Sequence, residues 1–406
     1  MASLLDRYHD QIAGVLSCWD RVVIRGTLPG LCYADGMSSY LNAQHVRIFD
    51  YPRFAEPLRD EVRSNAEKLA AKAGIEIEFM RKSSSRKEAR SELPTLARQA
   101  HPPDVSQADE RQVPDYYFYF IDEQLGLCYL RVPTWCPFGL QFYFNGHNWL
   151  ARQLDKAAIG YKLLDNAFVQ IDDFEAAQKI ADALDIRKLQ RALDRFAKRY
   201  CPVVRQFALG YHWSLMQVEY ATDIVFRRQR DLAPVYEAIT RTAVHTVKAE
   251  HVATFLGRKL SGNYKDEVGN DFSTRIEGTR IRHHMGPASI KMYDKFGLVL
   301  RIETTANNVS FFKHHRKVEQ RDGTIVYKLA PLKKSIYSLG DLQRLLLAAN
   351  RRYLDFISAI DEPSDGNHLV GKICDTKIDN YRAYKGFNFF SAQDQCVFEV
   401  LLTANS

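Results

Sequence analysis

A tyrosine flanked by two lysines lies within Ser289–Thr305, which reads SIKMYDKFGLVLRIETT. Lys291 and Lys295 each stand two residues from Tyr293. A phenol has a pKa of about 10, so a tyrosine nucleophile needs nearby cations that stabilise its phenolate. A divalent cation would polarise the phosphate that the tyrosine attacks. These residue types predict Tyr293 as a candidate catalytic nucleophile; the alternative is a tyrosine that serves only as a good strand former.

Apolar and polar side chains alternate in 289–295 and again in 299–305, which predicts two strands joined by a turn at Gly297. The apolar side chains share one face only if the loop has an odd number of residues, such as the three residues 296–298. Because a one-residue slip exchanges the two faces, burial selects this register. It pairs Tyr293 with Arg301 and Lys291 with Glu303, and its expected buried face holds Ile290, Met292, Leu300 and Ile302.

Positive charge is concentrated around these strands. Residues 275–321 contain ten Lys/Arg and four Asp/Glu, so 10 − 4 leaves +6 of the chain's total of +7. Clustered cations repel one another unless an anion compensates them, which predicts a phosphate-binding surface. A solvated sheet face with a Lys–Glu pair is the alternative. The predicted nucleic-acid-binding residues are Arg280, Arg282, Lys291, Lys295, Arg301, Lys313, Arg316 and Lys317.

Two adjacent histidine pairs, at 283–284 and 314–315, are poor candidates for a metal site. Neighbouring residues in a strand face opposite ways, so each pair offers at most one ligand. A metal would therefore need carboxylates, whose hard oxygens suit Mg²⁺ or Mn²⁺. The candidate metal ligands are Glu219, Asp223 and Glu303, and solvated or salt-bridged acids are the alternative.

Tyr-Asp-Lys followed by Arg-Ile-Glu, within Ser289–Thr304, resembles a pattern of rolling-circle replication initiators from filamentous phages and small plasmids. Those proteins nick single-stranded DNA with a tyrosine, on an α+β fold and with a divalent cation, so the resemblance implies this role for Tyr293. The His-hydrophobe-His metal motif of many such nickases is absent. The whole chain resembles a widespread family of uncharacterised bacterial proteins whose longer members look like they end in a winged-helix segment. That likeness implies that Phe387–Ser406 begins such a segment.

Hydrophobic periodicity gives the elements that must position these residues. Strands and helices do not alternate regularly, which favours an α+β fold with antiparallel sheets, packed helices and more than one domain. The expected helices are 3–16, 56–73, 147–154, 173–184, 186–200, 232–242 and 339–360. The expected strands, besides the two above, are 21–26, 75–79, 116–121, 127–132, 141–144 and 210–226.

Changes in composition along the chain suggest five regions. We expect an N-terminal α/β region at 1–81, a polar linker or insertion at 82–114 and an aromatic-rich α+β region at 115–204. A basic, strand-rich nucleic-acid-binding domain follows at 205–335. The last region, 336–406, is expected to be helical and to contain a truncated winged helix.

Aromatic residues occupy both faces of two expected strands, in YYFYF at 116–120 and FYF at 142–144. One face could stack nucleic-acid bases, and a two-sided core strand is the alternative. In the NGHNW stretch at 145–149, His147 is either a polar functional group or part of a turn that caps a helix.

The remaining composition limits the function classes. The chain has no run of eighteen apolar residues and no signal-peptide pattern at its start, which predicts a cytoplasmic protein without a membrane span. Its seven cysteines include no C-x-x-C motif, which indicates reduced thiols. No P-loop, dinucleotide fingerprint, G-x-S-x-G or HExxH motif occurs, so nucleotide hydrolysis, serine esterase and zincin activities lack support.

The sequence therefore predicts a nucleic-acid-binding protein of a mobile-element or DNA-replication type, with DNA favoured over RNA. The first alternative is a metal-dependent tyrosine DNA nickase with Mg²⁺ or Mn²⁺. The second is a transcription regulator whose winged helix is cut short. The oligomeric state stays open.

Overall fold

The computed structural model describes residues 4–80, 105–108, 115–134, 138–207, 210–260, 264, 266–275, 278–360, 376–379, 382–388, 391, 393–397 and 400. Helices and antiparallel strands occur together without regular alternation. The predicted α+β class is thus confirmed. Most of the expected linker at 82–114 and much of the expected winged-helix start at 387–406 lie outside the described residues.

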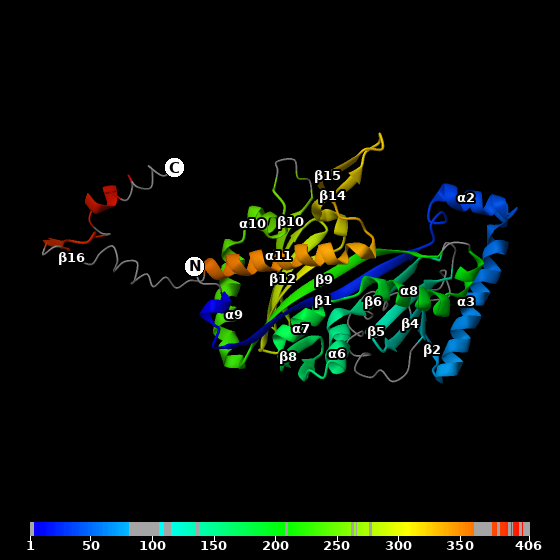
Figure 1. Cartoon of the computed structure of the whole chain (residues 1–406), viewed down its shortest axis with the longest axis horizontal. Coiled ribbons are helices and arrows are strands. Elements are labelled where there is room, and N and C mark those ends of the chain that lie inside the picture. Colours follow the sequence, from blue (N-terminus) through cyan, green and yellow to red (C-terminus); the bar gives the residue numbers. More distant parts are fainter. Residues whose placement is uncertain are drawn as a thin grey trace.

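An 11-stranded sheet forms the centre of the molecule (Figure 1), in the order β10-β11-β12-β13-β9-β1-β6-β5-β4-β3-β2. Every neighbouring pair is antiparallel except β2 and β3. Strands from the expected regions 1–81, 115–204 and 205–335 share this one sheet. The strands are β1 (Ile12–Thr27), β2 (Ile77–Met80), β3 (Val105–Ala108), β4 (Asp115–Asp122), β5 (Gly126–Pro133), β6 (Leu140–Asn145), β9 (His212–Phe226), β10 (Val268–Arg275), β11 (Gly278–Met285), β12 (Ala288–Lys295) and β13 (Val299–Ala306).

The sheet consists of two halves that join between its longest strands, β1 and β9. After β1 the chain forms helices α2 (Ala34–Ala43) and α3 (Tyr51–Ala73), and the strands β4, β5 and β6 then lead back to β1. After β9 it forms α9 (Gln229–Thr246) and α10 (Ala249–Phe255), and the strands from β10 to β13 lead back to β9. The sequence shows no internal repeat, so the two halves are alike in topology alone.

Helices cover one face of the sheet, and the main apolar core lies beneath them. On α8 (Ile186–Tyr200), Phe196 packs against Phe120 and Phe142. The helix α11 (Leu339–Ile360) lies against β9 and β13 (Figure 1), where Asn350 accepts a hydrogen bond of 2.6 Å from Thr304. Most side chains that alternate toward these helices are aromatic or aliphatic, as burial on this face requires. Two polar ones, Thr304 and Thr222, are satisfied by hydrogen bonds to Asn350.

The predicted pairing of β12 with β13 is confirmed in its register. Tyr293 lies opposite Arg301, and Lys291 lies opposite Glu303. The loop has three residues, and Phe296 and Gly297 adopt φ of 60° and 68°. The four expected core side chains, Ile290, Met292, Leu300 and Ile302, are all 0% exposed.

The other described elements are short, and the start of the chain differs from the sequence prediction. The predicted helix at 3–16 is wrong, because α1 spans only Leu4–Arg7 and the chain then pairs with β9 from Ile12 onward. The remaining elements are α6 (Gly146–Lys156), β7 (Tyr161–Leu164), β8 (Ala167–Ile171), α7 (Phe174–Ala181), β14 (Lys313–Glu319), β15 (Ile325–Pro331), β16 (Lys377–Asp379) and β17 (Arg382–Tyr384), with short 3-10 turns between them. Among the described residues, no helix combines the length and the hydropathy that a bilayer crossing requires.

We expect Phe142→Ala to lower the free energy of unfolding by about 3–5 kcal/mol, because it removes a fully buried ring between the sheet and α8. Phe49→Ala is the matched control, since this phenylalanine is 91% exposed and should change stability by less than about 0.5 kcal/mol. Chemical denaturation followed by circular dichroism measures both. Equal losses in the two variants would contradict the core described above.

Candidate active site at the centre of the sheet

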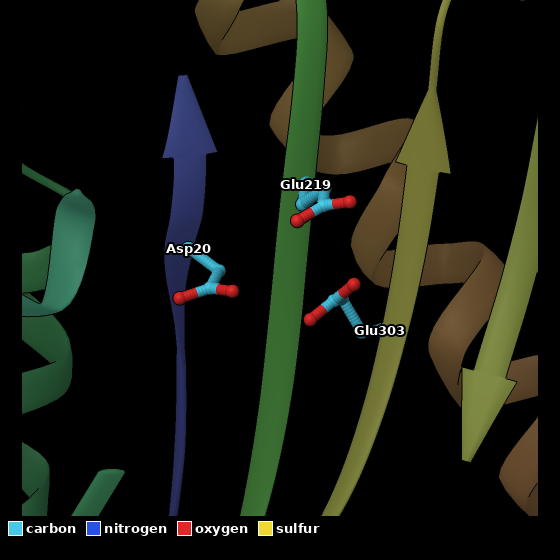
Figure 2. Close-up of side chains that lie close together, drawn as sticks. All are labelled: Asp20, Glu219 and Glu303. Atoms are coloured by element: carbon cyan, nitrogen blue, oxygen red, sulfur yellow. The ribbon is translucent and has the colours of Figure 1, made fainter. Parts of the chain in front are cut away.

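Three carboxylates from three adjacent strands meet on the face opposite α8 and α11 (Figure 2). Asp20 comes from β1, Glu219 from β9 and Glu303 from β13, and each offers an oxygen within 4.8 Å of the other two. The exposed fractions are 7% for Asp20, 7% for Glu219 and 1% for Glu303. Buried charges of one sign are costly, so the cluster must be compensated by cations from the protein or from solution.

A β-bulge in β1 directs Asp20 toward the other two acids. Trp19 pairs with Tyr220 and Val22 pairs with Val218, so both Asp20 and Arg21 lie opposite Glu219. In a regular strand these two neighbours would point to opposite faces. Here both reach the same face, and Arg21 Nε lies 3.4 Å from Glu219 Oε2.

Lys291 connects two of the acids. Its Nζ donates to Glu303 Oε1 at 2.6 Å and to Glu219 Oε1 at 3.0 Å. The Thr305 hydroxyl also donates to Glu219 Oε1, at 3.2 Å. Burial and the neighbouring Glu219 raise the pKa of Glu303 above its ordinary value, although Lys291 opposes this rise. Glu303 is therefore a better proton acceptor than an exposed glutamate.

The Tyr293 hydroxyl is directed at this acceptor. It donates to Glu303 Oε2 at 2.7 Å, and the side chain is half-buried. Burial and the charge of Glu303 raise the pKa of Tyr293 well above its ordinary value, while Arg301 acts in the opposite direction. The phenol is thus neutral at pH 7, and its proton already points at the group that could accept it.

A second buried network orients Asp20. The fully buried Arg301 donates to both oxygens of Asp223 at 2.6 Å, and its Nη2 lies 2.9 Å from His147 Nε2. The other ring nitrogen of His147, Nδ1, lies 3.1 Å from Asp20 Oδ1. Burial opposes ionisation of Asp223, but Arg301 and His147 outweigh it and lower the pKa of Asp223 to about 2.

One nitrogen of Arg301 has unused hydrogen-bonding capacity next to the acids. Nη1 is buried, lies 3.8 Å from Asp20 Oδ1 and makes no hydrogen bond within the part of the chain that the structure describes. A buried donor without a partner costs about 1–3 kcal/mol. A phosphate oxygen beside the acids would satisfy this N–H. The all-oxygen donor set of the three carboxylates fits Mg²⁺ or Mn²⁺, which prefer carboxylate ligands.

The turn between β7 and β8 encloses one side of the site. Asn166 Nδ2 donates to Asp20 Oδ1 at 2.7 Å, and the Asn166 side-chain oxygen accepts a hydrogen bond from Lys295. Lys295 Nζ also lies 3.3 Å from Asp165. Asn145, which caps α6 through the N–H groups of His147 and Asn148, donates to Asp20 Oδ1 at 3.0 Å.

The predicted site residues fall into three groups. The first group forms the acidic cluster and its immediate surroundings: Glu219, Asp223, Lys291, Tyr293, Lys295, Arg301 and Glu303. Arg280 and Arg282 lie on the adjacent strand β11, where Arg282 pairs with Lys291 in register. Lys313, Arg316 and Lys317 lie on β14, in a separate sheet. Asp223 binds Arg301, and Asp20 completes the acidic cluster with Glu219 and Glu303.

Three residues of the site, Asp20, Arg21 and Asn166, were not predicted from the sequence. For Asp20 and Arg21 one signal was present, because they interrupt an otherwise apolar run in the stretch VLSCWDRVVI. His147 was considered as a functional group, and the structure places it in the buried network. The histidine pairs behave as expected at 283–284: His283 faces Tyr353 on the covered side at 3.0 Å, and burial lowers its pKa to about 4.

A row of half-buried tyrosines extends the site face across β6, β5 and β4. The rings of Tyr143 and Tyr129 stack at 5.1 Å, and Tyr129 also contacts Tyr117 and Tyr119. The guanidinium of Arg21 lies 5.9 Å from the Tyr143 ring, so the row reaches the acidic cluster. The alternating phenylalanines of these strands face α8 instead. The aromatic strands therefore present a core face and a separate tyrosine face.

No family model matches the chain, and no match was found among curated proteins or solved structures. Function must therefore be inferred from the side chains and their geometry. The resemblance to replication initiators stays a prediction.

We expect Arg301→Met to lower the free energy of unfolding by about 3–5 kcal/mol, because it leaves Asp223 charged and buried without the cation that donates to both of its oxygens. The double variant Arg301→Met/Asp223→Leu should recover most of that loss, since removing both partners of a buried pair is close to neutral. Arg282→Met is the control, because its side chain is 36% exposed and its pair with Asp271 contributes at most about 1 kcal/mol. A double variant less stable than Arg301→Met would contradict this account.

We expect Mn²⁺ to bind the acidic cluster and to bind more tightly as the pH rises. The folded-state pKa of Glu303 is raised, so protons compete with the cation for this carboxylate below that pKa, and the ionised carboxylate binds the cation above it. Isothermal titration calorimetry over pH 5–8 measures the affinity. Glu219→Gln should weaken binding at least roughly tenfold, and Asp271→Asn, which removes a half-exposed acid outside the cluster, should not. Equal affinities in both variants would exclude this site.

Proposed function

We propose that the protein binds nucleic acid and cuts and rejoins a phosphodiester bond, with Tyr293 as the nucleophile and a divalent cation at Asp20, Glu219 and Glu303. The observation that carries this proposal is the hydrogen bond of 2.7 Å from the Tyr293 hydroxyl to Glu303. That bond joins a candidate nucleophile to a candidate base within a three-carboxylate cluster. It is the activated-nucleophile arrangement that phosphoryl transfer to a tyrosine requires.

The proposed step balances without a co-reactant. The Tyr293 oxygen attacks phosphorus and forms a phosphotyrosine ester, while its proton passes to Glu303. One phosphorus–oxygen bond to the sugar breaks, and the departing oxygen leaves as a hydroxyl with the proton that solvent water relays from Glu303, which returns to its carboxylate form. The reverse attack by a sugar hydroxyl rejoins the strand and restores the phenol.

Cations of the protein are placed to support this charge transfer. Lys291 lies beside Glu303, and the unpaired Arg301 Nη1 can donate to a phosphate oxygen. Arg21 is 37% exposed at its side chain and can guide the strand to the acids. A bound Mg²⁺ or Mn²⁺ would polarise the phosphate.

A single strand is the substrate form that the surrounding surface favours. The tyrosine row lies on the same face as the acids, and aromatic rings stack unpaired bases at about 1–3 kcal/mol per base. Such stacking requires bases that are not already paired within a duplex. The row therefore supports a single strand that runs from the tyrosines to the acidic cluster.

Binding without cutting is the second candidate, and one observation favours it. The Nζ of Lys291 lies between Glu219 and Glu303, where a metal ion would otherwise compensate the charge. Five acids are present (Asp20, Asp165, Glu219, Asp223, Glu303). Four Lys/Arg side chains (Arg21, Lys291, Lys295, Arg301) and His147, whose pKa is raised well above its ordinary value although burial opposes this, already balance them in formal charge. In that case the cluster is a stabilising network, and exposed cations alone bind nucleic acid.

We expect the wild-type protein to form a covalent adduct with labelled single-stranded DNA in the presence of Mn²⁺, detected by denaturing gel electrophoresis. Tyr293→Phe should abolish the adduct because it removes the attacking oxygen, and a chelator should abolish it as well. Tyr129→Phe is the matched control, since this tyrosine lies on the same face but does not contact the acids.

An adduct that persists in Tyr293→Phe would rule out this nucleophile. No adduct on any single-stranded DNA, together with intact binding, would favour the second candidate.

A further inference from the structure

The strands β14 and β15 form a basic ribbon, defined as Lys313–Pro331, that projects from the body (Figure 1). Its base is anchored to the rest of the protein. Leu332 N donates to Phe312 O at 2.9 Å, and His314 Nδ1 lies 3.4 Å from Asp341 of α11. Ala330 is buried at this base, with an exposed fraction of 5%. The other residues of β15 are exposed.

The distal part of the basic ribbon exposes large apolar side chains. The exposed fractions are 68% for Ile325, 43% for Val326, 68% for Tyr327 and 56% for Leu329. Ile325, Tyr327 and Leu329 alternate along one face, and the Tyr327 ring stacks on His315 at 5.8 Å. Exposed apolar groups gathered on one small element mark a contact surface.

Positive charge surrounds these apolar side chains. Residues 313–334 contain seven Lys/Arg and two Asp/Glu, so 7 − 2 leaves +5. Lys317 is paired with Tyr327, and Arg316 lies directly opposite Lys328. Like charges opposite one another destabilise a strand pair. An anionic partner on the basic ribbon would remove that repulsion.

We propose that the basic ribbon inserts into the major groove of duplex DNA beside the strand that the acidic cluster processes. This inference rests on the proposed function and adds a duplex-binding element to it. A major groove about 12 Å wide admits a two-stranded ribbon, with lysines reaching the phosphates and apolar side chains reaching base edges and thymine methyl groups. The basic ribbon exposes both the lysines and the apolar side chains that such contacts require.

B-form DNA fits this surface better than duplex RNA or a second copy of this chain. The major groove of A-form RNA is deep and narrow, so side chains cannot read it. A second copy of this chain carries the same positive charge at this position, and two ribbons would therefore repel each other.

The test is fluorescence anisotropy of a labelled 20-base-pair DNA duplex with the full chain carrying Tyr293→Phe, so that binding is measured without cutting. The ribbon variant replaces three exposed lysines, Lys313→Ala/Lys317→Ala/Lys328→Ala. The matched control also replaces three exposed lysines, Lys156→Ala/Lys188→Ala/Lys198→Ala, all in helices of the body. We expect the ribbon variant to lose roughly tenfold or more in duplex affinity and to show a flatter salt dependence. The control should change less than about twofold.

Four measurements separate this inference from the proposed function: adduct formation, duplex-RNA affinity, single-strand affinity and sedimentation. With Tyr293 intact, the ribbon variant should retain adduct formation with single-stranded DNA. Affinity for duplex RNA should be weak both with and without the three lysine substitutions. Equal losses in the ribbon and control variants, or an equal loss of single-strand and duplex affinity, would overturn the duplex proposal. So would a change in sedimentation from dimer to monomer in the ribbon variant, which would identify the ribbon as a contact between copies.

Discussion

The buried pair between Arg301 and Asp223 fixes the centre of this sheet. Arg301 is fully buried and donates to both carboxylate oxygens, so a loss of register between β13 and β9 would leave two charges unpaired in the interior. Such a loss costs several kcal/mol, far more than an exposed pair contributes. The same register places Glu303 two pairs further along β13, on the same face as Arg301 and within reach of Glu219. The position of the acidic cluster thus depends on this ion pair.

The site belongs to the join between the two halves of the sheet rather than to either half. The first half contributes Asp20 through the β1 bulge, and it also contributes Asn145 and His147, which hold Asp20 in place. The second half contributes Glu219 and Glu303. Bulges concentrate beside functional sites because they redirect a side chain without ending the pairing. Here the redirected side chain is the one acid that the second half lacks.

Local sequence patterns were sufficient to predict the pairing of β12 with β13. The register of β12 and β13 followed from alternation, because only one loop length buries Ile290, Met292, Leu300 and Ile302 together. The helix expected at 3–16 failed because β9 imposes extended pairing from Ile12 onward, and a tertiary partner overrides local periodicity.

The full set of site residues could not be predicted from local sequence patterns, because it depends on contacts between distant segments. Asp20 and Glu303 are far apart in sequence and meet only because β9 lies between their strands. Alternation also assigns Arg301 to the polar face, but it does not reveal that the β7–β8 turn and His147 enclose that face. A side chain predicted to lie on an exposed phosphate-binding surface is therefore buried.

The charge balance of the site constrains how it could bind the proposed cation and phosphate. Five acids and five bases, with Asp165 and His147 included, cancel before any ligand arrives, and Lys291 occupies the space between two of the acids. A divalent cation alone would add two uncompensated charges in a medium of low dielectric. A phosphate alone would approach acids already satisfied by the protein. The cation and one backbone phosphate together add a net charge of +1 instead of +2, because each phosphodiester carries one negative charge, and the phosphate could also pair with Arg301 Nη1. Binding of each ligand should thus strengthen binding of the other, as linkage requires. A cluster that is stable without a metal can in this way still be a metal-dependent site when the strand is present.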